Sequence, residues 1–260
     1  MAIDLSDYEA GTKYDGDYTA DLLELQQRLA RVQAAHIIHG KEAIILLEGW
    51  DAAGKGGIIQ RMCAEWDPRY FQVWPISAPT QPEKDRHFLY RFWTRMPGKR
   101  EIAVFDRSWY GRVLVERVEG FAAERDWQRG FDEINVFEAQ LTEHGITLVK
   151  LFTHVTQKEQ DRRLADRLDD PWKRWKTGAE DFRNRAKRAE YLTAYADMFS
   201  RTDSLWAPWT VIDSNNKKSA RIAALTHVAD ALEAAVPMAA PEADPAVVAL
   251  AQTAFGYRPA

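Results

Sequence analysis

The chain has 260 residues, a formal net charge of −4 and a single cysteine; 46% of its residues are hydrophobic and 28% are charged. This composition is typical of a globular protein with room for a full core, it excludes an internal disulfide, and no apolar run approaches the ~20 residues of a membrane span. The acidic N-terminus lacks the basic segment and following apolar segment of a secretory signal peptide, so we expect a cytoplasmic protein without a membrane partner.

The charges are unevenly distributed along this acidic chain. Between Arg86 and Arg117 eight Lys or Arg residues stand against three Asp or Glu, and between Lys173 and Arg188 seven stand against two. A basic middle inside an acidic protein predicts a local polyanion site rather than general binding of nucleic acid.

The first predicted elements lead into a buried strand. An irregular arm, residues 1–17, precedes a helix predicted over Tyr18–His39 by leucines at helical spacing, and Gly40 is expected to end it. The next apolar run, Ala43–Leu47, predicts a strand buried on both faces, as a parallel sheet requires.

The turn after this strand has the spacing of a phosphate-binding loop. Gly49, Gly54 and Lys55 form a G-x-x-x-x-G-K pattern between the strand and a helix expected over residues 56–65. In such a loop the backbone N–H groups and the helix start cradle phosphate, and Lys55 adds a full charge. The expected cradle consists of Gly49, Ala52, Ala53, Gly54, Gly56 and Gly57. The alternative is an ordinary strand-to-helix turn with Lys55 merely exposed.

Two features of the loop are unusual. Gly56 follows Lys55 where a Ser or Thr hydroxyl commonly binds Mg²⁺, and a carboxylate, Asp51, lies inside the loop. The two features fit together if Asp51 replaces the missing hydroxyl as a magnesium ligand.

A second carboxylate is expected beside the loop. After a strand over 71–76 and a helix over 83–96 with Phe88, Leu89 and Phe92 inward, a third strand over 101–106 ends in Asp106. In phosphate-loop folds the second magnesium-organising Asp sits at such a strand end. Three arginines follow within eleven residues, and surface ion pairing is the alternative to a phosphate role for each of them: Arg107, Arg112 and Arg117.

The remaining elements complete an alternating pattern. We expect helices over 127–144 and 218–234, strands over 146–152 and 209–213, and a loosely docked tail over 237–260. Thr156 and Glu159 form a predicted capping box for a helix running through Asp170, on which Arg163 and Arg167 share a face.

A basic segment follows the fourth predicted strand. Lys173, Arg174 and Lys176 crowd four positions and are placed to close over phosphates, whereas Trp172 and Trp175 are expected to pack inward. The simplest organisation is one domain over 1–260 with a lid insertion at about 156–200.

These motifs resemble the polyphosphate kinase 2 family. The resemblance rests on Gly49–Gly57, on Phe105–Phe121 with its specific Asp-Arg-Ser-Trp-Tyr run, on Pro171–Lys176 and on Ala207–Asp213. It implies a three-layer α/β fold of the thymidylate-kinase-like, P-loop kinase type, with a five-stranded parallel sheet and a helical lid. It also implies reversible, Mg²⁺-dependent phosphoryl transfer from inorganic polyphosphate to an adenine or guanine nucleotide, with Mn²⁺ as an alternative ion, in a homodimer or homotetramer.

The resemblance also implies roles for particular residues. Asp51 and Asp106 match the magnesium carboxylates of the family, and three cations match its phosphate-binding side chains: Lys55, Arg107 and Arg167. The nucleotide site is expected at Arg112, Glu116 and Arg117.

Within the family the chain is most similar to the AMP-phosphorylating branch. Gly111 stands where ADP-phosphorylating members tend to carry Asn, while some AMP-using relatives hold two tandem copies and this chain holds one. AMP is therefore the expected acceptor, with ADP an additional one. The rival hypotheses are an ATP-dependent small-molecule or nucleotide kinase of the same fold and a non-catalytic polyanion-binding module.

Overall fold

The computed structural model describes residues 3–258, and its centre is a five-stranded parallel sheet in the order β2-β3-β1-β4-β5. The strands are β1 (Ala43–Gly49), β2 (Phe71–Pro75), β3 (Ile102–Asp106), β4 (Thr147–His154) and β5 (Trp209–Asp213). The first four residues of β3 and nearly all of β1 and β4 are buried, as expected for strands covered by helices on both faces. The predicted α/β fold with a five-stranded parallel sheet is confirmed.

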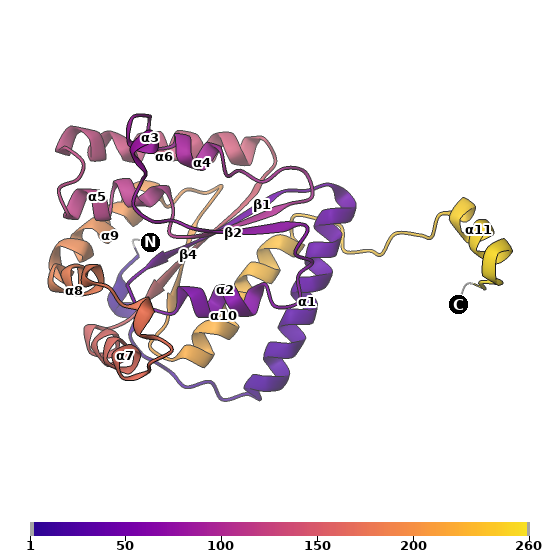
Figure 1. Cartoon of the computed structure of the whole chain (residues 1–260), viewed down its shortest axis with the longest axis horizontal. Coiled ribbons are helices and arrows are strands. Elements are labelled where there is room, and N and C mark those ends of the chain that lie inside the picture. The colour runs from indigo at the N-terminus through magenta and orange to yellow at the C-terminus, as the bar shows by residue number, and fades with distance from the viewer. Residues whose placement is uncertain (1–2, 259–260) are drawn as a thin grey trace.

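Helices cover both faces of this sheet (Figure 1). The helices of the described chain are α1 (Tyr18–His39), α2 (Lys55–Met62), α3 (Gln81–Lys84), α4 (Tyr90–Trp93), α5 (Val115–Val118), α6 (Glu124–Glu143), α7 (Gln157–Asp169), α8 (Ala179–Ala186), α9 (Arg188–Thr202), α10 (Lys217–Glu233) and α11 (Pro245–Phe255). Short 3₁₀ turns are η1 (Leu5–Tyr8), η2 (Trp109–Arg112) and η3 (Arg174–Lys176).

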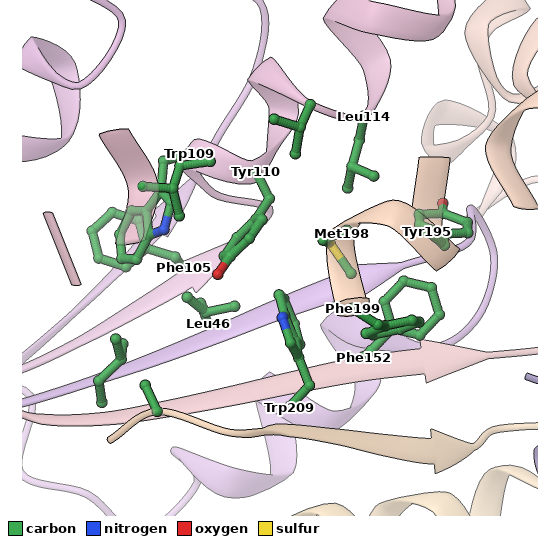
Figure 2. Packing of buried hydrophobic residues seen from close by; sticks show 14 of the residues in the cluster. Leu46, Phe105, Trp109, Tyr110, Leu114, Phe152, Tyr195, Met198, Phe199 and Trp209 are labelled. Atoms are coloured by element: carbon green, nitrogen blue, oxygen red, sulfur yellow. The ribbon is translucent and has the colours of Figure 1, made fainter. Parts of the chain in front are cut away.

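Each face of the sheet has its own core. Helices α1, α2 and α10 pack on one face through side chains such as Leu29, Ile58 and Leu225. On the other face, aromatic residues of η2 and α9 meet the strands, and Figure 2 shows Trp109 and Tyr195 among them. The second core lies directly beneath the segment that follows β3, so it fixes that segment in place.

The strand order places three strand ends together. Because β1 lies between β3 and β4, the chain departs to opposite sides of β1, and the carboxyl ends of these three strands meet at one edge. Ligands of open α/β sheets bind at such a switch point. The fold therefore places the glycine-rich loop and Asp106 in the same region.

The helix predicted over 83–96 is wrong as a single element. The structure has two single turns, α3 and α4, separated by residues 85–89. Side chains compete with the helical backbone here: Arg86 donates to the Pro82 carbonyl, and the Leu89 N–H donates to His87 Nδ1. Leu89 and Phe92 are nevertheless buried, as predicted.

Two further predictions about side chains are corrected. Trp172 and Trp175 do not pack inward but are 88% and 78% exposed. The capping box at Thr156 is only half formed, because Thr156 accepts from the Glu159 N–H while Asn215 accepts from the Thr156 N–H. The Glu159 carboxylate pairs instead with Arg163 and its neighbour Arg162.

The C-terminal segment contains a helix that the sequence did not predict. None of the residues of α11 is buried, and Figure 1 shows this helix apart from the sheet and its covering helices. Within residues 3–258, no helix has the length and apolar character needed to cross a bilayer.

A buried ion pair fastens β4 to α6. Lys150 Nζ lies 2.8 Å from Glu138 Oε2 and donates to the Tyr110 hydroxyl and the Thr202 carbonyl, and both charged side chains are fully buried. Glu138 Oε1 also accepts from Trp109 Nε1 and the Tyr110 hydroxyl. Burial lowers the pKa of Lys150, opposed by the Glu138 charge. The pair thereby holds the turn after β3 to the core.

Replacing one member of this pair should strongly destabilise the protein. Lys150→Met leaves the Glu138 carboxylate buried without a counter-charge, which should lower the free energy of unfolding by about 3–5 kcal/mol. The control Lys150→Met/Glu138→Gln removes both charges but keeps an acceptor for Trp109, and it should recover much of the loss. Urea unfolding measures both; equal destabilisation in the two variants would contradict this role of the charges.

Candidate active site

The glycine-rich loop between β1 and α2 has a backbone that requires glycine at defined places. Gly49 and Gly54 have φ of 126° and 111°, and Ala52 also lies in the left-handed region at 60°. A Cβ on Gly49 would stand 2.2 Å from the Thr153 carbonyl oxygen, so β4 leaves no room for a side chain. The close approach of β1 to β4 thus sets the start of the loop, and α2 begins at its end.

Lys55 is folded back onto this loop. Its Nζ donates to the carbonyls of Gly49 and Trp50 at 2.8 and 3.0 Å, and only 8% of the residue is exposed. Burial and the nearby Arg107 charge lower the pKa of Lys55, opposed by the charges of Asp51 and Asp106. The ammonium group is therefore held by two carbonyls at the start of the loop, and its third N–H can donate to a phosphate oxygen.

Asp51 and Arg107 form an ion pair across the site. Arg107 Nη2 lies 2.5 Å from Asp51 Oδ1, and Asn184 of α8 donates to Asp51 Oδ2 at 2.9 Å. Burial alone would raise the pKa of Asp51, but the charges of Arg107 and Lys55 outweigh burial, and the pKa is lowered. Burial disfavours the Arg107 cation, yet Asp51 and Glu48 raise its pKa above the ordinary range. Both groups are therefore ionised at neutral pH.

Asp106 joins this cluster from the neighbouring strand. It is the last residue of β3 and pairs in register with Leu47 of β1, four residues before Asp51. Its negative charge opposes the lowering of the Lys55 pKa by burial and contributes to the raised pKa of Arg107. The structure thus brings together four of the five residues predicted to be catalytic: Asp51, Lys55, Asp106 and Arg107. The fifth, Arg167, lies on α7.

The two carboxylates suit a hard divalent cation that is shared with a substrate. In the described part of the chain, no group of three or more His, Cys, Asp or Glu residues forms a closed metal cage. Mg²⁺ at phosphoryl-transfer sites usually takes one or two carboxylates and completes its octahedron with water and phosphate oxygens. Asp51 and Asp106 fit that donor set.

Several residues that hold the loop were missed by the sequence analysis. Arg163 donates through Nη1 to the carbonyls of Ala52 and Ala53 at 3.2 and 2.9 Å, and through Nη2 to the Ser214 carbonyl. Gln160 donates to the Asp51 carbonyl at 3.1 Å. The shared helical face of Arg163 and Arg167 was the only available signal, because nothing in the sequence shows that α7 lies against the loop.

A buried carboxylate beneath the loop was also missed. Glu48 accepts a hydrogen bond of 2.7 Å from the Ser108 hydroxyl. Burial raises the pKa of Glu48, although Ser108, Lys55 and Arg107 oppose this shift. Glu48 therefore ties the end of β1 to the residue that follows Arg107.

The predicted lid cations lie on the segment after α7 and make local contacts. Lys173 pairs with Asp170, Arg174 donates to the Leu168 carbonyl, and Lys176 Nζ lies 5.1 Å from the Trp175 ring centre. Arg167 donates to the Lys176 carbonyl and lies 4.0 Å from Asp181 of α8. Lys173, Arg174 and Lys176 lie on an exposed segment between α7 and α8, residues 170–178, which we call the flap. The flap is connected to the phosphate loop through these two helices.

The three residues predicted for the nucleotide site separate into two groups. Arg112 pairs with Glu116 at 3.2 Å, and its guanidinium lies 4.7 Å from the centre of the Phe88 ring. Arg117 instead pairs with Asp197 at 2.7 Å and lies over Trp127. Arg112 and Glu116 thus form one cluster beside an aromatic ring, while Arg117 joins the packing of α6 and α9.

Comparison with known proteins gives consistent matches. A family model described as polyphosphate kinase 2 matches residues 12–239. A polyphosphate:AMP phosphotransferase of Pseudomonas aeruginosa is 44% identical over 232 residues, which are 89% of this chain and 47% of that protein. ADP-polyphosphate phosphotransferase 3 of Rhizobium meliloti is 40% identical over 84% of this chain and 76% of its own length.

A solved structure agrees with these sequence matches. The crystal structure of polyphosphate kinase 2 from Arthrobacter aurescens TC1 has a TM-score of 0.88 and 35% identity, covering 96% of this chain and 93% of that one. The chain therefore spans about half the length of the relatives named polyphosphate:AMP phosphotransferase, and nearly all of the Arthrobacter structure.

The carbonyl contacts of Arg163 generate a prediction. Arg163→Lys keeps the charge but cannot reach the same set of loop and Ser214 carbonyls, so the variant should lose about 1–3 kcal/mol of stability because buried acceptors are left unpaired. It should also bind tripolyphosphate more weakly. Urea unfolding measures the loss of stability, and titration calorimetry measures the binding of tripolyphosphate. Arg162→Lys, in an exposed ion-paired neighbour, is the control, and indistinguishable behaviour of the two variants would contradict the role of Arg163.

Proposed function

The chain belongs to the polyphosphate kinase 2 family, and on that premise we propose that it transfers the terminal phosphoryl group of inorganic polyphosphate to a nucleotide. AMP is the proposed acceptor of choice, ADP a weaker one, and the reaction is reversible. The observation that carries the proposal is the convergence of Asp51, Lys55, Asp106 and Arg107 at the carboxyl ends of β1 and β3.

The proposed chemistry needs alignment and charge neutralisation rather than a strong base. The attacking oxygen of a nucleotide phosphate is already ionised near neutral pH, so no residue has to remove a proton from it. Lys55 and Arg107 can neutralise the charge on the transferred group, and the start of α2 adds backbone N–H groups. Lys55 donates to the Gly49 and Trp50 carbonyls, and the third N–H of its ammonium group can donate to a phosphate oxygen.

We propose Mg²⁺, with Mn²⁺ as an alternative, as the ion held by Asp51 and Asp106. When bound, such an ion would supply positive charge that neutralises the phosphates. Arg107 pairs with Asp51 Oδ1 in this structure, so Asp51 would have to exchange this partner for the ion, and the Arg107 guanidinium would then be available to phosphate.

The remaining predicted residues are assigned to the two substrates, polyphosphate and nucleotide. We propose that the flap cations Lys173, Arg174 and Lys176, with Arg167, bind the polyphosphate chain beyond the loop. We propose further that Arg112 and Glu116, with Arg117 behind them, line the site of an adenine or guanine nucleotide, in a cytoplasmic homodimer or homotetramer.

Three observations bear on the choice between AMP and ADP as acceptor. The relatives named polyphosphate:AMP phosphotransferase are 42–45% identical, but this chain covers less than half of each. A relative named ADP-polyphosphate phosphotransferase 3 is 40% identical and better covered. Gly111 favours AMP, because the resemblance associates Asn at this position with ADP.

The decisive experiment supplies Mg²⁺ and polyphosphate with AMP, ADP, GMP or GDP separately and follows the new nucleotide. We expect the highest kcat/KM with AMP, and we expect Asp106→Asn to stay folded but lose about 100-fold or more in turnover. Transfer from ATP but not from polyphosphate would instead identify the ATP-dependent kinase. Binding of polyphosphate without turnover, undiminished in Asp106→Asn, would identify a polyanion-binding module. A clear preference for ADP would overturn the choice of acceptor.

The flap cations generate a separate prediction about donor length. Lys173→Gln/Lys176→Gln should raise KM for long polyphosphate far more than KM for AMP, because AMP carries one phosphate and the chain extends beyond the loop. The salt dependence of donor binding should also decrease, since salt screens exposed charges. Lys41→Gln/Lys99→Gln removes two exposed charges before β1 and β3, at the opposite sheet edge, and serves as control. An equal rise in both KM values would mean that these lysines order the whole flap.

A further inference from the structure

Trp50, inside the phosphate loop, is held by a side chain that the proposed chemistry does not use. Its indole Nε1 donates to His154 Nδ1 at 2.9 Å, and both residues are almost fully buried. The Trp50 backbone accepts from Lys55 at 3.0 Å and donates to the Thr153 carbonyl at 3.3 Å, and Asp51 is the next residue. The position of this indole therefore constrains both a phosphate-binding cation and a metal-binding carboxylate.

The hydrogen-bond chemistry of His154 is determined by its two partners. An indole N–H can only donate, so Nδ1 must be the acceptor and Nε2 must carry the proton. His154 Nε2 lies 3.0 Å from Glu9 Oε1, which can only accept when it is ionised. Burial lowers the pKa of His154, opposed by Glu9 and reinforced by Arg188, and this favours the neutral ring that the geometry requires.

Glu9 belongs to the segment before α1, which is docked on the carboxyl ends of β4 and β5. The Gly11 N–H donates to Asp213 at 2.7 Å, and Asn215 donates to the Tyr8 carbonyl. Leu5 belongs to the core that also contains Trp109 and Tyr195. From the sequence alone, residues 1–17 are predicted to form an irregular arm. In the structure, residues 3–12 instead supply the outer end of a hydrogen-bonded chain into the loop.

A cation lies over the face of the indole. The Arg188 guanidinium lies 4.0 Å from the centre of the Trp50 ring and donates to the Val155 carbonyl at 2.7 Å. The Tyr195 ring meets the same indole edge to face at 4.8 Å. The indole thus has contacts on its face and edge but only one partner for its N–H.

We propose that Glu9 and His154 are positioning residues for the phosphate loop: Glu9 fixes the tautomer of His154, and His154 fixes Trp50 and thereby Lys55 and Asp51. Neither residue needs to touch a substrate. The effect on catalysis rests on the proposed function, whereas the effect on the loop itself does not.

Full-length variants test this chain of hydrogen bonds. Glu9→Ala removes the acceptor for His154, Glu9→Gln retains an oxygen that can accept from Nε2, and Asp7→Ala removes an exposed acid of the same segment as control. We expect Glu9→Ala to lower kcat about tenfold with little change in KM for AMP or in Tm, and Glu9→Gln to restore most of the loss. A general loss of folding would instead lower Tm.

Two measurements do not depend on catalysis. Nitrogen NMR of the histidines, with His154→Phe to assign the signal, should show an unprotonated Nδ1 and a protonated Nε2 for His154. Amide hydrogen exchange of residues 49–55 should be faster in Glu9→Ala than in Asp7→Ala. If the wild-type protein fails to use polyphosphate, the proposed function fails, and these measurements still decide how the loop is held.

Three results would overturn the inference. One is a His154 ring protonated on Nδ1, and another is equal loop exchange in Glu9→Ala and Asp7→Ala. The third is faster exchange in Glu9→Ala with unchanged kcat in a wild-type protein that does transfer phosphate, because loop order would then not matter to turnover.

Discussion

A loop that turns its N–H groups toward an anion must turn carbonyls away from it, and these buried acceptors need donors from elsewhere. In this protein each carbonyl from Gly49 to Ala53 accepts from a long side chain, and the Trp50 carbonyl also accepts from the Ala53 N–H. The donors are Lys55 for Gly49 and Trp50, Gln160 for Asp51, and Arg163 for Ala52 and Ala53. Two of these three side chains come from α7, so three of the five loop carbonyls depend on α7 for their side-chain donor.

This dependence couples the loop to the flap. Helix α7 carries Gln160 and Arg163 on the side of the loop and continues through Arg167 into the exposed basic turn η3. From the other end of the flap, α8 returns to the site through Asn184, which donates to Asp51. The flap is therefore connected to the loop backbone by α7 and to the Asp51 carboxylate by α8.

The sequence predicted what depends on local pattern and missed what depends on neighbours. The five strands and the convergence of Asp51 and Asp106 follow from apolar runs and from the parallel order of the strands. The helix over 83–96 failed because side chains compete for the backbone there. The prediction that Trp172 packs inward was wrong because apolar character alone does not show whether another element lies near the side chain. The role of Arg163 was missed because, in a sequence, a buried arginine on a charged helix looks the same as a solvated one.

The charge balance at the loop indicates why cation and anion should bind together. Three carboxylates, Glu48, Asp51 and Asp106, surround two cations, Lys55 and Arg107, so a phosphate arriving alone meets a cluster with no excess of positive charge. It must also compete with Asp51 for Arg107. A divalent ion held by Asp51 and Asp106 would change both conditions, since it would add two positive charges and would free Arg107 from Asp51. The carboxylate inside the loop, which is unfavourable for binding a bare anion, would then be favourable for binding a metal–phosphate complex.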